Sequence, residues 1–178
     1  YSNLGNVLKD LDKLKEAELS YLKAIKLNPN LAEVYSNLGT ILIDIGRLKD
    51  AERSYLKAVR LNPNLTMAYF CLSTLNLSNK NAIWRDQLFS QNLLDKKSKK
   101  DQINIYFARA NILHRESNFK ESSKYLQLAN NLKYQLYSSN LKYLINKSKE
   151  LLLKSNKKLF IENEFKNFPE SIFIVGMP

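Results

Sequence analysis

Tyr1-Ser-Asn-Leu-Gly5 recurs along the chain as Tyr35-Ser-Asn-Leu-Gly39. Two further blocks recur at the same offset: Ser20-Tyr-Leu-Lys-Ala24 as Ser54-Tyr-Leu-Lys-Ala58, and Leu27-Asn-Pro-Asn-Leu31 as Leu61-Asn-Pro-Asn-Leu65. Because separate blocks share one offset, the chain from Tyr1 to Leu65 forms an internal repeat.

Each copy of the repeat has the spacing of two packed helices. A stripe at i, i+3, i+4 and i+7 predicts the first helix and consists of Tyr35, Leu38, Gly39 and Leu42. The stripe of the second helix, which is expected to face the first, consists of Ala51, Tyr55 and Ala58. Glycine inside a helix costs about 1 kcal/mol relative to alanine. We therefore expect that Gly39, which lacks a Cβ, lets the second helix approach closely.

The remaining turn residues of the repeat mark its boundaries. Gly46 is expected between the two helices, where a residue of positive φ ends the first one, and Asp12 takes that place in the first copy. Pro63 stops the second helix and disfavours the α region for Asn62.

The helix–turn–helix pattern and its period resemble the tetratricopeptide repeat, which is about 34 residues long. The resemblance implies an all-α solenoid of stacked helix hairpins. We expect four units over residues 1–134, at residues 1–31, 32–65, 66–95 and 99–134, of which the last two are degenerate. In the third unit, Ala82 to Leu94 is expected as a second helix, and Lys96 to Lys100 as a solvated linker. In the fourth, two helices are expected to carry stripes: Tyr106, Ala110 and Leu113, then Phe119, Ser122, Leu126 and Ala129.

A helical connector is expected over residues 135–168, followed by a different element at residues 169–178. Ser171-Ile-Phe-Ile-Val-Gly-Met-Pro178 is a continuous apolar run that predicts one buried strand, after which Gly176 permits a sharp turn. A strand that runs into a glycine turn is the front half of many phosphate-binding loops. Since Tyr1 aligns with the fourth position of the repeat, we also expect that the chain begins inside a helix and ends inside a second domain.

The order of repeats, lysine-rich connector and terminal strand resembles the bacterial sulfotransferases that carry an N-terminal tetratricopeptide domain. The resemblance implies that Gly176, Met177 and Pro178 begin the loop that grips the donor 3′-phosphoadenosine-5′-phosphosulfate (PAPS), which would be a co-substrate of the parent protein. The catalytic part of the resemblance covers only residues 171–178, so we expect this chain to be catalytically incomplete and to bind no cofactor by itself. Two alternatives stay open: a free-standing tetratricopeptide adaptor, and an arm of an O-linked glycosyltransferase.

The family resemblance also implies a protein or peptide partner in a concave groove lined by the first helices. The groove positions that we select as candidates are Asn3, Asn6, Lys9, Glu33, Asn37, Thr40 and Asp44. Asn3 and Asn37 share one position of the repeat, and an amide can both donate to and accept from a peptide backbone. Cys71 and Ala108 take the matching places further on, which argues against a long asparagine-lined channel.

Composition excludes several other function classes. The net charge of +11 is concentrated in residues 96–178, which hold 16 Lys or Arg and 7 Asp or Glu, but no RNA-binding signature accompanies it, so we expect no nucleic-acid partner. Cys71 is the only cysteine, which rules out an intrachain disulfide and favours a reducing, cytoplasmic setting. No apolar stretch is long enough for a membrane span. His114 is the only histidine and lacks partner ligands in sequence, so neither a metal site nor a catalytic residue is predicted.

Overall fold

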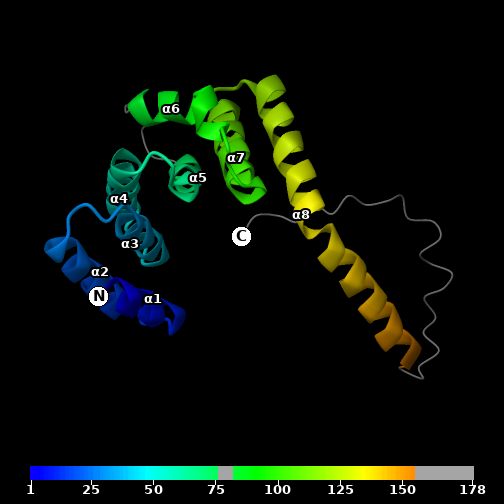
Figure 1. Ribbon diagram of the computed structural model, residues 1–178, viewed down its shortest axis with the longest axis horizontal. Coiled ribbons are helices and arrows are strands. Elements are labelled where there is room, and N and C mark those ends of the chain that lie inside the picture. The colour runs from blue at the N-terminus through cyan, green and yellow to red at the C-terminus, as the bar shows by residue number, and fades with distance from the viewer. Residues whose placement is uncertain (76–81, 155–178) are drawn as a thin grey trace. The chain divides into compact units, whose positions relative to one another are not determined.

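The fold is seen in a computed structural model, which describes residues 1–75 and 82–154 and the side chains of residues 1–75 and 83–137. The described residues form helices and turns, with no strand among them (Figure 1). In chain order the elements are α1 (Ser2–Asp10), α2 (Leu14–Leu27), α3 (Ala32–Asp44), α4 (Leu48–Leu61), α5 (Thr66–Thr74), α6 (Ala82–Phe89), the 3₁₀ helix η1 (Gln91–Leu94), α7 (Lys99–Arg115) and α8 (Phe119–Lys154). The expected strand at residues 169–178 and the end of the expected connector lie outside the described residues.

The first two units are helix hairpins that a glycine and a tyrosine lock together. The rings of Tyr21 and Tyr55 are fully buried, and a Cβ on Gly39 would lie 2.8 Å from Cε2 of Tyr55. The same contact joins Gly5 to Tyr21 in the first unit. The expected role of these glycines is confirmed, because no other residue would leave space for the tyrosine ring.

Both hairpin turns end their first helix with a residue of positive φ, as expected. Gly46 has φ +80° and Asp12 has φ +59°. Asn62 leaves the helical region with ψ +95°, so that the second helix ends before Pro63. A third turn of this kind joins α7 to α8, where Ser117 has φ +59°.

The third unit departs from the hairpin pattern. α5 runs beside α7 in the same direction, since Thr66 accepts from Asn104 Nδ2 (3.4 Å) while Asn111 Nδ2 donates to Ser73 Oγ (3.0 Å). The helix expected over residues 82–94 is wrong in its extent: α6 ends at Phe89, and Gln91–Leu94 form a separate 3₁₀ turn.

The break after Phe89 has a physical cause in Arg109 of α7. This arginine is 5% exposed, and it donates to the carbonyls of Leu88 (2.8 Å) and Ser90 (2.8 Å). A guanidinium at the carboxyl end of a helix satisfies carbonyls that have no helical partner and opposes the negative end of the helix dipole. Arg115 acts similarly at the end of α5, where it donates to the carbonyls of Ser73 and Leu75.

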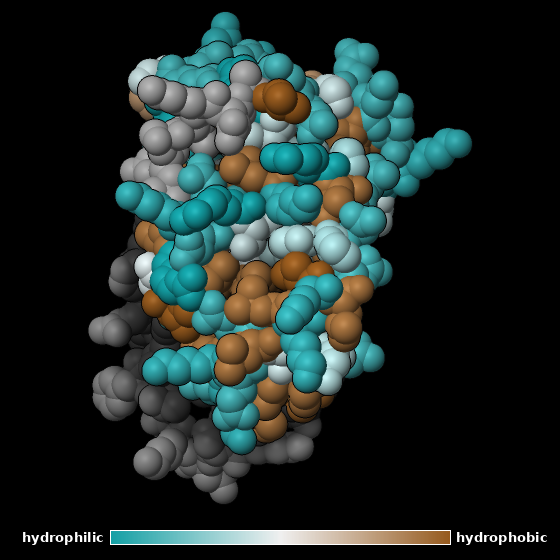
Figure 2. Space-filling view, turned by 90° about the vertical axis from the view of Figure 1, so that its left-hand side faces the viewer, coloured by the Kyte–Doolittle hydropathy of each residue, from teal (hydrophilic) through white to brown (hydrophobic). Residues whose placement is uncertain are grey.

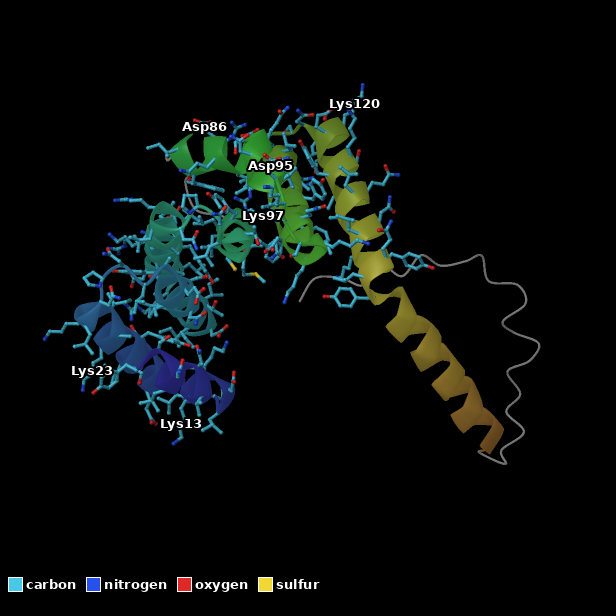
Figure 3. All side chains as sticks on the ribbon, viewed as in Figure 1. Lys13, Lys23, Asp86, Asp95, Lys97 and Lys120 are labelled. Carbon is cyan, nitrogen blue, oxygen red and sulfur yellow. The ribbon has the colours of Figure 1, made fainter. Side chains whose placement is uncertain are left out.

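The fourth unit is again an antiparallel hairpin, formed by α7 and the first part of α8. Ser122 Oγ donates to the Ala110 carbonyl (2.9 Å), and the Tyr106 and Tyr125 rings lie 5.9 Å apart. Ser122 and Ala129 are buried as expected, whereas two other members of the expected stripe are exposed: Phe119 (59%) and Leu126 (38%). Lys97, labelled in Figure 3, precedes α7 and donates to Asn64 Oδ1 at 2.8 Å. Lys99 and Lys100 belong to α7 rather than to a linker.

Candidate peptide-binding face

The candidate residues from the sequence lie on α1 and α3, the first helices of the two regular units. We call the seven residues the first-helix face: Asn3, Asn6, Lys9, Glu33, Asn37, Thr40 and Asp44. Asn3, Glu33 and Asp44 are exposed, and the other four are half-buried. In Figure 1, α1, α3 and α5 follow one another on one side of the stack, with α2 and α4 on the other.

Asn6 joins the first two units through hydrogen bonds. Its Oδ1 accepts from the Tyr21 hydroxyl (2.7 Å) and from Asn37 Nδ2 (3.0 Å). Tyr21 belongs to the second helix of the same unit, whereas Asn37 belongs to the first helix of the next. The amide of Asn6 is therefore fixed by two donors, and the amide of Asn37 is fixed in turn.

The same arrangement recurs one repeat later with other side chains. Thr40 takes the place of Asn6 in the second unit, and its Oγ1 lies 3.0 Å from the hydroxyl of Tyr55. Cys71, which takes the place of Asn37 in the third unit, lies beside the same hydroxyl. Burial raises the pKa of Tyr55 far above its usual range and also raises the pKa of the Cys71 thiol.

The two tyrosine hydroxyls are the part of this face that the sequence did not predict. The stripe positions of Tyr21 and Tyr55 indicate core residues, and their rings are indeed core. A tyrosine has a polar tip, however, and a buried tip needs a partner. The available signal was the pairing of each tyrosine with a polar residue 15 positions earlier, Asn6 or Thr40. Asn37 donates to Asn6 rather than pairing with a tyrosine hydroxyl. Asn3 is not among the residues that form these hydrogen bonds.

Apolar side chains that are exposed or half-buried lie on α5 and α7. In α5, Met67 is 44% exposed, and the half-buried rings of Phe70 and Phe107 lie 6.3 Å apart. Ala108 is fully buried and offers no polar group. Cys71 and Ala108 therefore do not extend the pair Asn3 and Asn37.

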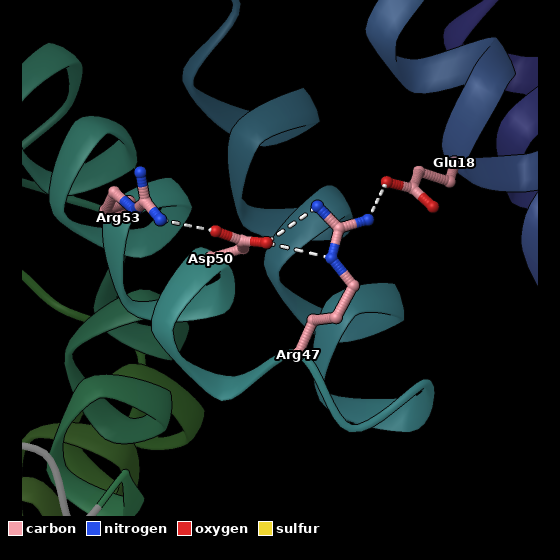
Figure 4. Close-up of polar contacts among 4 residues, drawn as sticks. All are labelled: Glu18, Arg47, Asp50 and Arg53. Atoms are coloured by element: carbon pink, nitrogen blue, oxygen red, sulfur yellow. Dashed lines mark hydrogen bonds and ion pairs between the residues drawn. The ribbon is translucent and has the colours of Figure 1, made fainter.

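Charged side chains on the opposite helices form a link between units (Figure 4). Arg47 donates to Glu18 Oε1 (2.6 Å) of the first unit and to Asp50 Oδ2 (2.8 Å) of its own, and Arg53 donates to Asp50 Oδ1 (2.7 Å). The hydrogen bond from Arg47 is the main reason that the pKa of Asp50 is lowered. These pairs are solvent-exposed and belong to the scaffold.

No candidate metal centre is found among the described residues. In the parts of the chain that the structure describes, no three His, Cys, Asp or Glu residues are close enough together to hold a metal ion. His114 is exposed in the last turn of α7, where its ring meets Phe119 edge-on at 5.2 Å. Cys71 is a free cysteine packed half-buried against the core. Gly176, Met177 and Pro178 lie outside the described residues.

The helices that the structure describes include none with the length and apolar character of a membrane span. Comparison with curated proteins finds no match to the chain.

Two family models match the repeats, and a solved structure has a similar fold. Residues 5–44 match the model for the TPR repeat, and residues 32–65 match the model for the tetratricopeptide repeat. A solved structure described as "MamA RS-1 ArsTM double mutant" has 19% identity and a TM-score of 0.51, over 76% of this chain and 74% of that one. At this identity the likeness concerns the fold alone. Residues 5–65 are thus tetratricopeptide repeats, and the described part of the chain is an α-solenoid built on them.

Proposed function

We propose that this chain is a protein-interaction scaffold whose first-helix face binds an extended polypeptide segment. The repeats support the scaffold role, because stacked helix pairs create extended surfaces suited to a partner chain. The observation that carries the peptide proposal is the pair of amides Asn6 and Asn37, which are hydrogen-bonded to each other across two units.

The chemistry of the two amides supports binding to a peptide backbone. Each asparagine amide has two donor hydrogens and one carbonyl with two lone pairs. Asn37 uses one hydrogen in its bond to Asn6, so its Oδ1 and its second hydrogen can pair with the N–H and C=O of a peptide. Because Tyr21 holds Asn6 in place, less side-chain entropy is lost on binding than with free side chains.

The charges around the amides indicate a mixed partner rather than a strongly acidic or basic one. Lys9 belongs to the face, and so do Glu33 and Asp44. A peptide with charges of both signs would therefore suit it better than a polyanion.

The test is a peptide selection followed by matched substitutions. A displayed library of random extended peptides is panned on the 178-residue protein, and the affinity of each selected peptide is measured by fluorescence anisotropy. Asn37→Ala should weaken binding about tenfold, the equivalent of about 1.4 kcal/mol. Lys49→Ala, at an exposed position of α4, is the control and should leave the affinity unchanged. Equal affinities for the two variants would contradict the proposal.

We further propose, as the finer interpretation, that the repeats present substrate or partner to a PAPS-dependent sulfotransferase domain in a cytoplasmic protein. The support is the resemblance of residues 171–178 to the start of a donor loop and the single cysteine. Determining the coding sequence beyond Pro178 tests it: Arg-Ser-Gly-Thr followed by an α/β pattern would support this interpretation, and a stop codon at that point would leave the free-standing adaptor. Calorimetry of the chain from Tyr1 to Pro178 with PAPS should detect no binding.

A further inference from the structure

Two aromatic rings lie side by side on the neighbouring helices α5 and α7 (Figure 1). The ring centroids of Phe70 on α5 and Phe107 on α7 are 6.3 Å apart, and the ring planes are inclined by 59°. Both side chains are half-buried, and neither belongs to the buried hydrophobic core. Met67, one helical turn before Phe70, is 44% exposed. We call Met67, Phe70 and Phe107 the apolar platform.

The repeat register relates the platform to the first-helix face. Met67 stands in the third unit where Glu33 of that face stands in the second, 34 residues earlier. Thr40 Oγ1 of α3 lies 3.0 Å from the Tyr55 hydroxyl, and Cys71 of α5 lies beside the same hydroxyl. Since Cys71 directly follows Phe70, a segment that continues from α3 to α5 meets the platform.

Hydrogen bonds between α5 and α7 fix the two sides of the platform. Asn104 Nδ2 donates to Thr66 Oγ1 (3.4 Å), and Asn111 Nδ2 donates to Ser73 Oγ (3.0 Å). These asparagines lie one helical turn before and one turn after Phe107. The rings are thus held in place before a partner arrives, which lowers the entropy lost on binding.

Exposed apolar side chains by themselves do not identify a docking site. Figure 2 shows the left-hand side of Figure 1, where hydrophobic side chains are interspersed with hydrophilic ones. Leu48 of α4, for example, is 43% exposed. The platform differs from such positions because it joins two rings on helices that are bonded to each other, next to the first-helix face.

A positive charge lies beside the platform. Lys100 is exposed and lies two turns before Phe107, on the same side of α7. Asp101, its acidic neighbour, accepts from Ser98 Oγ (2.6 Å) and from Thr66 Oγ1 (2.6 Å). An acidic side chain of a partner would therefore be complementary to Lys100.

We propose that the apolar platform binds one large apolar side chain, aromatic or long aliphatic, of the extended segment that the amides bind. An acidic residue of the same segment lies next to that side chain, at Lys100. This inference rests on the proposed function, because it concerns the same partner. Phenylalanine and methionine suit such a side chain, since they offer a large apolar area and favourable contacts with aromatic rings.

The test uses the 178-residue protein and the peptides selected on it. Met67→Gln removes an exposed apolar group with little change of size and should weaken binding about threefold. Leu48→Gln, at a position of matching exposure on α4, is the control and should leave the affinity unchanged. Phe107→Ala should weaken binding about tenfold. Circular dichroism verifies that each variant is folded, and Met67→Gln decides the question if Phe107→Ala is not.

Matched changes in the peptide identify the contact. An alanine scan locates the large apolar residue of each peptide, whose loss should weaken binding to the original protein about tenfold. The same replacement should weaken binding to Phe107→Ala by about twofold or less, because the contact is already gone, whereas the tenfold loss should persist in Asn37→Ala. Replacement of the acidic peptide residue by its amide should weaken binding to the original protein but not to Lys100→Gln.

The outcomes separate this inference from the proposed function. Peptides that depend on Asn37 but bind Met67→Gln and Phe107→Ala unchanged would overturn the inference and leave the proposed function standing. Peptides that depend on the platform but not on Asn37 would support the platform and contradict the proposed function. An equal loss from the alanine replacement in the original protein and in Phe107→Ala would also overturn the inference, because the apolar residue would then bind elsewhere.

Discussion

Gly39 and Tyr55 are in such close contact that a side chain on the first would occupy the ring of the second. The Cβ of an alanine at position 39 would lie 2.8 Å from Cε2 of Tyr55, and 2.9 Å from Cε1. The ring is fully buried and belongs to the rigid core of the hairpin. The contact explains why a helix former is absent at this position.

Gly39→Ala should therefore destabilise the protein, although alanine is the better helix former. Overpacking of a rigid core costs about 1–3 kcal/mol, which exceeds the propensity gain of about 1 kcal/mol in most of that range. Urea unfolding followed by circular dichroism measures the loss. In a Tyr55→Leu background the added penalty of Gly39→Ala should shrink, because leucine leaves room for the Cβ. An equal penalty in both backgrounds would show that the ring is not the obstacle.

Ser117→Gly should stabilise the protein, because Ser117 has the positive φ that Gly46 has in the corresponding turn. Relief of the left-handed conformation stabilises the folded state by about 1–2 kcal/mol. Part of this gain is lost because glycine has more conformational freedom in the unfolded chain. We expect a net gain of up to about 1 kcal/mol in urea unfolding. The matched control is Ser123→Gly within α8, which should cost about 0.5 kcal/mol. A loss of stability in Ser117→Gly would contradict the explanation.

Arg109→Met should destabilise the protein by about 2 kcal/mol or more. The substitution removes the donors to the Leu88 and Ser90 carbonyls and leaves the buried carbonyl of Leu88 unsatisfied. Chemical unfolding of the variant is compared with that of Arg53→Met, whose side chain is 76% exposed and whose cost should stay within about 0.5 kcal/mol. Similar costs for the two variants would mean that the end of α6 does not depend on Arg109.

Stability should fall between about pH 10 and pH 12 in part because of Tyr69. Burial raises the pKa of Tyr69 to about 12, against an ordinary value of 10.0. Since the folded state holds the proton more tightly, the stabilisation is complete below pH 10 and is lost as the pH rises through about 12. Urea titrations across this range measure the slope, which should be shallower in Tyr69→Phe. Tyr21 and Tyr55 contribute in the same direction, because burial raises the pKa of both. An unchanged slope in Tyr69→Phe would contradict the assignment to Tyr69.

The regular units were predictable from sequence because their local signals and their packing agree. Gly46 and Pro63 favour by themselves the turn and the helix end that the fold requires. Gly39 and Tyr55 lie on the two helical stripes that the fold packs together. The third unit was predicted less well, since its geometry depends on a contact between residues distant in sequence. Arg109 donates to the Leu88 carbonyl at the end of α6 from 21 positions away, and the periodicity of residues 82–94 does not indicate that bond.

The candidate face was predictable in its positions but not in its bonds. Repeat register placed Asn6 and Asn37 on the first helices, whereas the bond between them depends on how two units stack. The part played by Tyr21 was hidden for a related reason. Helical periodicity assigns a whole residue to the core and does not distinguish a buried ring from a hydroxyl at its edge.

The most direct test of the account is a nuclear magnetic resonance titration of the ¹⁵N-labelled protein with a selected peptide. The account predicts that the side-chain amide signals of Asn6 and Asn37 shift together and saturate at the same peptide concentration. Signals from the outer pair Arg47 and Glu18 should stay in place. Shifts confined to α2 and α4, with both amides unmoved, would contradict the claim that the first helices bind the partner.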